Sequence, residues 1–266
     1  MTEITSPYAA ADADLAGLRA PESPVVDAGL LAGVSIVLPC FNEEANVADA
    51  IRNASAAARL TSLRHQIVVV DDGSSDGTAR IAAGLAERDP RVRVVVHPRN
   101  RGYGDAVRSG IAAATEPWVL LTDADLQFDL RELVDFLPVA PTSDLVVGWR
   151  RHRSDPLHRR LNAAAWNALV RSMFALPVHD VDCAFKLVRR DLLGEFELVS
   201  GGAMISTELL VRSLAAGARL SEVGVRHRPR VAGEQTGANP RVVIRAFREL
   251  AQLRSNLRGL SASATR

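Results

Sequence analysis

Short apolar runs recur along most of the chain, and segments of helical length separate them. The runs consist largely of valine, isoleucine and leucine, and they cover residues 34–38, 67–70, 92–96, 118–121 and 145–147. The segments long enough for helices cover residues 43–58, 78–88, 105–114 and 130–137. Apolar strands that alternate with helices are typical of a mostly parallel sheet with helices on both faces. The pattern therefore predicts an α/β fold with a Rossmann-like sheet.

The two ends of the chain differ from this central pattern. Residues 1–32 are rich in alanine, aspartate and proline without an apolar period, which indicates a mobile leader before a domain over residues 33–240. Residues 241–266 carry apolar side chains at helical spacing among arginines, namely Val243, Phe247, Leu250, Leu253 and Leu257. Such a basic amphipathic helix suits the surface of an anionic membrane. The same pattern also suits a helix docked on the domain or at the interface of a homodimer.

Composition excludes several broad classes of protein. Hydrophobic residues make up 47% and charged residues 24% of the 266 positions, which excludes collagen, coiled coil and wholesale disorder. Two cysteines, Cys40 and Cys183, exclude a disulfide-rich scaffold and favour a reducing compartment. No apolar run approaches the roughly 18–20 residues that span a membrane, and no signal-peptide pattern opens the chain. We therefore expect a cytoplasmic protein, in solution or peripheral on the cytoplasmic membrane face, with no nucleic-acid partner.

Basic residues gather in the second half of the chain, although the net charge is only +1. Residues 143–266 hold 20 of the 32 basic residues, and Lys186 is the single lysine. Arginine binds phosphate through planar, bidentate hydrogen bonds. The segment Arg150-Arg151-His152-Arg153, followed by Arg159 and Arg160, therefore suits a phosphate ligand. A solvated basic loop is the alternative.

Four loops that follow apolar runs are the first places to look for a ligand site, because ligands of such sheets bind at the carboxyl ends of the strands. They are Pro39-Cys40-Phe41-Asn42-Glu43, Asp71-Asp72-Gly73-Ser74-Ser75, Asn100-Arg101-Gly102-Tyr103-Gly104 and Asp123-Ala124-Asp125-Leu126-Gln127. Three of the four carry carboxylates. Their polar side chains are the candidates for ligand binding.

Asp123 and Asp125 form a candidate cation site. Residues two apart in an extended segment point the same way, so the two carboxylates repel each other unless a positive charge lies between them. Oxygen ligands of this kind suit Mg²⁺ or Mn²⁺, and the ion would hold a diphosphate. Gln127 adds a third polar side chain. Capping of the next helix is the alternative, but capping needs only one aspartate.

Asp72 ends the second apolar run, where a carboxylate can accept hydrogen bonds from a nucleobase or a ribose. The residues that follow it, 73–78, form a turn and cap the next helix. Capping alone is the alternative role for the acidic residues here, and it suits Asp76 better than Asp72.

The motifs in the four loops resemble those of the family 2 glycosyltransferases in both order and spacing. The matching segments are Leu38-Pro39-Cys40-Phe41-Asn42-Glu43-Glu44, Val70-Asp71-Asp72-Gly73-Ser74-Ser75-Asp76-Gly77-Thr78, Asn100-Arg101-Gly102-Tyr103-Gly104 and Asp123-Ala124-Asp125-Leu126-Gln127. The resemblance covers residues 33–240 and is greatest to the polyprenol-phosphate (dolichyl-phosphate) mannose or glucose synthases. It implies the GT-A fold, a nucleotide-sugar donor and Mg²⁺ or Mn²⁺ as cofactor.

The resemblance also implies roles for individual residues. The nucleoside pocket would be lined by Pro39, Asn42, Glu43 and Asp72. The metal and the donor diphosphate would be held by Asp123, Asp125 and Gln127, with Arg230 of the segment Arg230-Val231-Ala232-Gly233-Glu234 approaching the diphosphate. The acceptor phosphate would meet Arg150, with Arg159 or Arg160 as a second contact.

Departures from the family pattern leave the sugar and the acceptor open. Phe128-Asp129 stand where many synthases continue with prolines, and Gln235-Thr236-Gly237 contains no lysine. The pair Asp182-Cys183 replaces the small hydroxyl or glycine residues that usually precede the position of Phe185.

The acceptor decides whether the reaction needs a general base. A sugar hydroxyl must lose its proton during attack, and Asp182 and Glu208 are the carboxylates that would take it. Placement at a helix N-terminus is an equally good explanation of Glu208. A phosphate monoester has a second pKa of about 6 and is largely ionised at neutral pH, so it needs positioning by arginines instead.

The sequence thus predicts a metal-dependent, inverting transfer of a hexose from GDP-mannose or UDP-glucose to polyprenyl phosphate. A same-fold glycosyltransferase acting on a sugar or small-molecule hydroxyl is the main alternative, and a non-catalytic nucleotide-binding module is a distant one. A dinucleotide-binding oxidoreductase is excluded, because its glycine fingerprint belongs in the turn after the first strand, where this chain has Pro39-Cys40-Phe41-Asn42.

Overall fold

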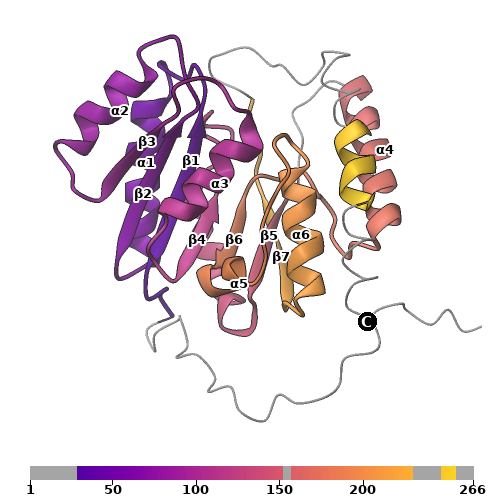
Figure 1. Ribbon diagram of the computed structural model, residues 1–266. Coiled ribbons are helices and arrows are strands. Elements are labelled where there is room, and N and C mark those ends of the chain that lie inside the picture. The colour runs from indigo at the N-terminus through magenta and orange to yellow at the C-terminus, as the bar shows by residue number, and fades with distance from the viewer. Residues whose placement is uncertain (1–28, 152–156, 230–246, 256–266) are drawn as a thin grey trace, which may run out of the picture.

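A seven-stranded sheet forms the centre of the molecule in a computed structural model that describes residues 29–151, 157–229 and 247–255 (Figure 1). The strands are β1 (Val34–Cys40), β2 (His65–Asp71), β3 (Val92–Val96), β4 (Trp118–Leu121), β5 (Leu145–Arg150), β6 (Lys186–Arg189) and β7 (Leu220–Val225). They lie in the order β3-β2-β1-β4-β6-β5-β7, and only the pairs that involve β6 are antiparallel. The predicted mostly parallel sheet is confirmed, and β6 and β7 are additions to the predicted strands.

Helices cover both faces of this sheet, as predicted. They are α1 (Val47–Thr61), α2 (Thr78–Ala86), α3 (Tyr103–Ala113), α4 (Leu157–Phe174), α5 (Arg190–Gly194) and α6 (Ile205–Ala215), with 3₁₀ segments η1 (Leu130–Phe136) and η2 (Ala140–Thr142). Side chains of α1, α2 and η1 share one core with one face of the sheet, and those of α3, α5 and α6 share a second core with the other face. Central strands such as β1 and β4 are buried on both faces, which explains why most of their residues are apolar.

The ordered fold begins before residue 33. Leu31 is fully buried in the core, its amide donates to the Thr61 carbonyl at 2.9 Å, and its carbonyl accepts the Leu63 amide at 3.0 Å. The predicted leader over residues 1–32 therefore includes a core residue at its C-terminal end, because one leucine ahead of Ala32-Gly33 leaves no periodic signal. Residues 1–28 of that leader lie outside the described residues.

A short helix over residues 247–255 represents the predicted C-terminal amphipathic helix, and it lies beside α4 (yellow and salmon in Figure 1). Leu250 and Leu253 are buried in the core that α3 and α6 share, and the ring of Phe247 contacts that of Trp166 edge-on at 5.3 Å. This stretch is a helix docked on the domain, which is one of the three arrangements that its pattern predicts. Among the described helices, none is long and apolar enough to cross a membrane.

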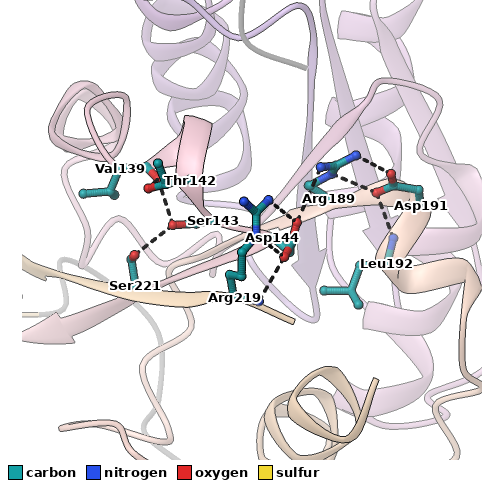
Figure 2. Close-up of polar contacts among 9 residues, drawn as sticks. All are labelled: Val139, Thr142, Ser143, Asp144, Arg189, Asp191, Leu192, Arg219 and Ser221. Atoms are coloured by element: carbon teal, nitrogen blue, oxygen red, sulfur yellow. Dashed lines mark hydrogen bonds and ion pairs between the residues drawn. The ribbon is translucent and has the colours of Figure 1, made fainter. Parts of the chain in front are cut away.

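Three strands are tied together at the end of the sheet where β5 begins. Figure 2 shows the carboxylate of Asp144, just before β5, between the guanidinium groups of Arg189 and Arg219. Arg219 donates to it from Nε and Nη2, both at 2.9 Å, and Arg189 donates from Nη1 at 3.4 Å. Arg189 ends β6 and Arg219 precedes β7. The network therefore joins β5, β6 and β7 at the edge opposite the four candidate loops.

We expect Asp144→Asn to lower the free energy of unfolding by about 1 kcal/mol at neutral pH. Hydrogen bonds from Arg219 lower the pKa of Asp144 in the folded chain. The carboxylate thus stabilises the fold above its unfolded pKa of about 3.9, and this contribution is lost as the pH falls through the lower folded value. Urea unfolding from pH 7 downwards measures it, with the exposed Asp135→Asn as control. A difference between wild type and Asp144→Asn that stayed constant into the acid range would contradict the assignment.

Candidate active site

The four candidate loops meet at one edge of the sheet, because they follow the carboxyl ends of neighbouring strands. Cys40, the last residue of β1, pairs with Asp71 at the end of β2, and Leu121, the last residue of β4, pairs with Lys186 at the start of β6. Burial raises the pKa of the Cys40 thiol, and the negative charges of Glu43, Asp71 and Asp123 raise it further. The edge therefore concentrates negative charge, which favours a cation there.

The loops after β1 and β2 hold each other in place. Asn42, with a φ of 56°, receives the Ser75 amide on its side-chain oxygen at 2.9 Å and donates its own amide to the Ser74 hydroxyl at 2.9 Å. The Glu43 amide donates to the Thr78 hydroxyl at 2.9 Å. A non-glycine residue in the left-handed region persists only where its surroundings hold it. The predicted nucleoside-pocket residues Asn42 and Glu43 thus lie in an interlocked pair of loops, next to the half-buried Pro39 of β1.

Asp72 lies at the predicted edge, but the chain itself uses its oxygens. The side chain is nearly fully buried and accepts the amides of Arg101 and Gly102 at 2.9 and 2.8 Å. The Nδ1 atom of His97 lies 2.6 Å from it, and the Nε2 atom of the same ring lies 2.9 Å from the Ser109 hydroxyl. Asp72 therefore anchors the loop of residues 100–104 and the start of α3.

Asp71 is a buried carboxylate for which the sequence analysis gave no role. Its Oδ2 atom accepts the Ser74 amide at 3.3 Å, and its Oδ1 atom accepts no hydrogen bond from the residues that the structure describes. A buried carboxylate oxygen left without a donor is costly, so this atom is a ready acceptor for a ligand. The doubled aspartate before Gly73 was the only signal of it in the sequence.

The candidate metal carboxylates lie in a tight turn after β4. Asp125 is 8% exposed and accepts the Gln127 amide on Oδ1 at 3.1 Å, across Leu126 with a φ of 62°. The hydroxyl of Tyr103 donates to Oδ1 of Asp123 at 3.0 Å. Burial and the charge of Asp123 raise the pKa of Tyr103, so the phenol keeps its proton and is the donor in this bond. The sequence alone does not point to this tyrosine, because its position in the loop of residues 100–104 carries no chemical signature.

This donor set fits a divalent cation that is shared with a diphosphate. Within the described part of the chain, no three histidine, cysteine, aspartate or glutamate side chains form a complete metal cage. Mg²⁺ and Mn²⁺ do not need one, since in nucleotide enzymes one or two carboxylates bind the ion and phosphate oxygens complete its shell. Asp123 and Asp125 supply two such carboxylates at an edge rich in negative charge.

Gln127 connects the turn that carries Asp123 and Asp125 to the segment that leads to Arg230. Its side-chain amide donates to the Arg228 carbonyl at 3.0 Å, and its own carbonyl accepts the Arg228 amide at 2.8 Å. The guanidinium of Arg228 also bonds Asp129 at 2.7 Å. The chain thus passes beside the turn that carries Asp123 and Asp125, two residues before Arg230. Arg230 itself lies outside the described residues.

The predicted acceptor arginine belongs to a buried ion pair. Arg150 bonds both oxygens of Asp180, from Nε at 2.6 Å and from Nη2 at 2.8 Å, with its side chain 11% exposed. The Asn167 amide of α4 donates to the same carboxylate at 3.3 Å. Arg159 and Arg160 lie in the first turns of α4, and their side chains fall outside the described residues.

The loop before β6 brings Asp182 to the same edge as the turn that carries Asp123 and Asp125. The ammonium of Lys186 is fully buried and donates to the carbonyls of Val181 and Cys183, on either side of Asp182. Burial lowers the pKa of Lys186. The negative charges of Asp180 and Asp182 act on both Lys186 and Arg150, so this half of the edge holds balanced charges.

Glu208 does not join this group. It is fully buried in the first turn of α6, where its carboxylate accepts the amides of Val199 and Ser200 at 3.0 and 2.7 Å and the Nε atom of Arg212 at 2.7 Å. These partners organise the loop before the helix. The surroundings of Glu208 favour the structural alternative over proton transfer.

Comparison with known sequences identifies the family. A sequence model described as Glycosyl transferase family 2 matches residues 35–196, which include all four loops. This chain is a family 2 glycosyltransferase. The glycosyltransferase is 35% identical over 205 residues to an uncharacterized glycosyltransferase of Mycobacterium tuberculosis, covering 76% of this chain and 88% of that protein.

Two other relatives of the glycosyltransferase have names that specify a lipid phosphate. It is 29% identical to dodecaprenyl-phosphate galacturonate synthase of Rhizobium johnstonii, over 84% of this chain and 65% of that protein. It is 31% identical to undecaprenyl-phosphate 4-deoxy-4-formamido-L-arabinose transferase of Pseudomonas paraeruginosa, over 76% of this chain and 59% of that protein. The chain thus spans less than two thirds of the length of each of these two relatives.

Solved structures share the GT-A fold of this glycosyltransferase. Glucosyl-3-phosphoglycerate synthase of Mycobacterium tuberculosis, in complex with Mn²⁺, UDP-glucose and phosphoglyceric acid, superposes with a TM-score of 0.64 at 20% identity, covering 84% of this chain and 80% of that one. Mannosyl-3-phosphoglycerate synthase of Rubrobacter xylanophilus gives 0.64 at 23% identity, covering 85% and 75%. The predicted family and fold are both confirmed.

Proposed function

We propose that this glycosyltransferase transfers a hexose from a nucleoside diphosphate sugar to polyprenyl phosphate in a single, inverting displacement. The observation that carries the proposal is the arrangement at one sheet edge, where Asp123 and Asp125 follow β4, Arg150 ends β5, and Asp182 lies in the loop before β6. The names of the lipid-phosphate relatives support the choice of acceptor.

On the donor side, the loops after β1 and β2 would bind the nucleoside, and Asp123 and Asp125 would hold the divalent cation. When bound, the cation neutralises the charge that develops on the leaving diphosphate. Asp72 keeps the loop of residues 100–104 against this site through the amides of Arg101 and Gly102. Arg230 would add a positive charge on the diphosphate. GDP-mannose and UDP-glucose both remain candidate donors.

On the acceptor side, the chain would position a phosphate that is already ionised. A phosphate monoester is largely dianionic at neutral pH and needs no base to attack the anomeric carbon. Arg150 is oriented by Asp180, in the way that a bidentate carboxylate holds a guanidinium fixed. Its remaining donors would meet the phosphate, together with Arg159 or Arg160.

We also propose that the enzyme reaches its lipid from the cytoplasmic face by peripheral contact. A groove of about 470 Å³ opens between α4 and the helix over residues 247–255, and Leu169, Met173 and Phe247 line it. Leu169 is 39% and Phe247 50% exposed, which places apolar side chains at the surface next to Arg254. Co-sedimentation with anionic vesicles tests this contact, and a chain that stays in the supernatant at low salt refutes it.

A donor panel tests the function directly. GDP- and UDP-sugars are incubated with Mn²⁺ or Mg²⁺, with and without a short polyprenyl phosphate, and release of the nucleoside diphosphate is measured. We expect release that depends on both the metal and the lipid phosphate, from one donor.

The second candidate is transfer to a hydroxyl, which the position of Asp182 favours. Asp182 lies at the sheet edge where the four candidate loops meet. Lys186 donates to the backbone carbonyls on either side of it, and a general base needs such fixed positioning. Release that ignores the lipid phosphate but falls in Asp182→Asn would select this candidate. Asp135→Asn, an exposed aspartate on η1, is the matched control.

A further inference from the structure

The backbone on the N-terminal side of Tyr103 is anchored by hydrogen bonds. The Asp72 carboxylate accepts the amides of Arg101 and Gly102, the two residues that precede Tyr103. Gly102 has a φ of 103° and a ψ of 159°, a conformation that is essentially restricted to glycine. The backbone conformation that leads into Tyr103 is therefore fixed.

The backbone after Tyr103 is anchored as well. The Gly104 amide donates to the Gly201 carbonyl at 3.0 Å, and a Cβ atom at position 104 would lie only 2.1 Å from the Ser200 carbonyl oxygen. Arg108, one turn further along α3, donates to the same oxygen at 2.9 Å. A glycine is therefore needed at position 104, where α3 packs against the loop of residues 199–201.

These backbone contacts place the hydroxyl of Tyr103 next to the carboxylate of Asp123. The ring of Tyr103 packs against the core on the α3 face of the sheet, and its hydroxyl donates to Oδ1 of Asp123 at 3.0 Å. A phenol has a single proton to donate, so the bond fixes which oxygen of Asp123 faces the tyrosine and limits rotation of the carboxylate. Groups in this position around metal ligands set the orientation of the ligand and tune its affinity.

We propose that Tyr103 is a positioning residue of the metal site, which orients Asp123 for the divalent cation that the donor diphosphate shares. This inference rests on the proposed function, because it assumes that Asp123 is a metal ligand. In this proposal Tyr103 acts on the cation only indirectly, through its hydrogen bond to Asp123. Its contribution is made through Asp123 alone, so it should appear in metal affinity and not in the chemical step.

The test removes the hydroxyl in two ways: Tyr103→Phe keeps the aromatic ring, and Tyr103→Met replaces it with a flexible apolar side chain. Mn²⁺ binding is followed by electron paramagnetic resonance in the presence of UDP and, separately, GDP, for wild type, Tyr103→Phe and Tyr103→Met. We expect both variants to bind Mn²⁺ roughly 10–100-fold more weakly than wild type with the same nucleotide. Turnover of Tyr103→Phe at saturating Mn²⁺ should stay close to wild type, while the Mn²⁺ concentration for half-maximal rate rises by the same factor.

Val107→Ala is the matched control, because Val107 is a buried residue of α3 one turn after Tyr103 and bears no hydroxyl. It loosens the same helix and should leave Mn²⁺ affinity nearly unchanged. Equal affinity of wild type and Tyr103→Phe overturns the inference, as does a loss in Val107→Ala that matches the loss in Tyr103→Phe. If the wild-type chain fails to bind Mn²⁺ in the presence of UDP and also in the presence of GDP, the proposed function is overturned instead.

Discussion

Asp125→Ala is expected to lower turnover by about 10³-fold or more. This is the largest effect that we expect of any single change at the sheet edge where the four candidate loops meet. Asp125 is one of two carboxylates that would hold the cation, and it is nearly buried in the turn after β4. Its loss leaves Asp123 as the remaining carboxylate of the pair, and the leaving diphosphate then has less positive charge beside it. Nucleoside diphosphate release with the preferred donor measures turnover, and calorimetry measures metal-dependent donor binding.

Asp125→Asn distinguishes the role of Asp125 as a metal ligand from its role in holding the turn. The asparagine side chain retains an oxygen that can accept the Gln127 amide, which Asp125 accepts at 3.1 Å, but it has lost the negative charge. We expect it to lose nearly as much turnover as the alanine variant while melting at the wild-type temperature. Asp135→Ala, a change of an exposed aspartate, should leave both quantities unchanged. Full activity in Asp125→Asn would remove the metal hypothesis.

Arg150→Ala is expected to lower the free energy of unfolding by about 3 kcal/mol or more, in addition to any effect on the acceptor. The change removes a guanidinium that bonds both oxygens of Asp180, whose side chain is 9% exposed. A carboxylate left in such surroundings without its cation is strongly destabilising. Chemical denaturation measures the loss, and Arg52→Ala, which breaks an exposed pair with Asp49, is the control.

The double variant Arg150→Met with Asp180→Leu should recover most of this stability, because a buried ion pair can be replaced by apolar side chains of similar volume at little cost. It should not recover use of the lipid phosphate. Arg150→Lys keeps the positive charge without the bidentate geometry, and we expect it to raise the KM for the acceptor while the donor KM stays unchanged. Equal losses on both substrates would mean that Arg150 does not face the acceptor.

The central strands could be predicted from the sequence because they are buried on both faces. β4 is an unbroken apolar run and β2 contains one over residues 67–70, and the sheet that they help to form has the predicted parallel pairing. β6 begins with a buried lysine, and β7 is half-buried with serine and glutamate in it, so neither gives a run. Burial of Lys186 depends on carbonyls of the preceding loop, which no local pattern reveals.

The candidate site shows the same division between what is local and what is not. The order of motifs was enough to bring Asp123 and Asp125 to one sheet edge beside the loops after β1 and β2, because strand ends determine where such loops lie. The partners of each side chain depend on tertiary packing. Asp72 turned out to bond the loop of residues 100–104, and Glu208 the loop before α6. Neither contact follows from the spacing of residues in the chain.

The single lysine of the chain gives this fold a built-in chemical reporter. Lys186 is buried under the loop that carries Asp182, and its ammonium is occupied by two carbonyls of that loop. An amine-reactive reagent can acylate it only when the loop lifts away from the start of β6. Every other basic side chain is an arginine or a histidine, so no second lysine competes for the label. The rate of acylation at Lys186, with and without a nucleotide sugar, therefore reports how often the loop that carries Asp182 opens.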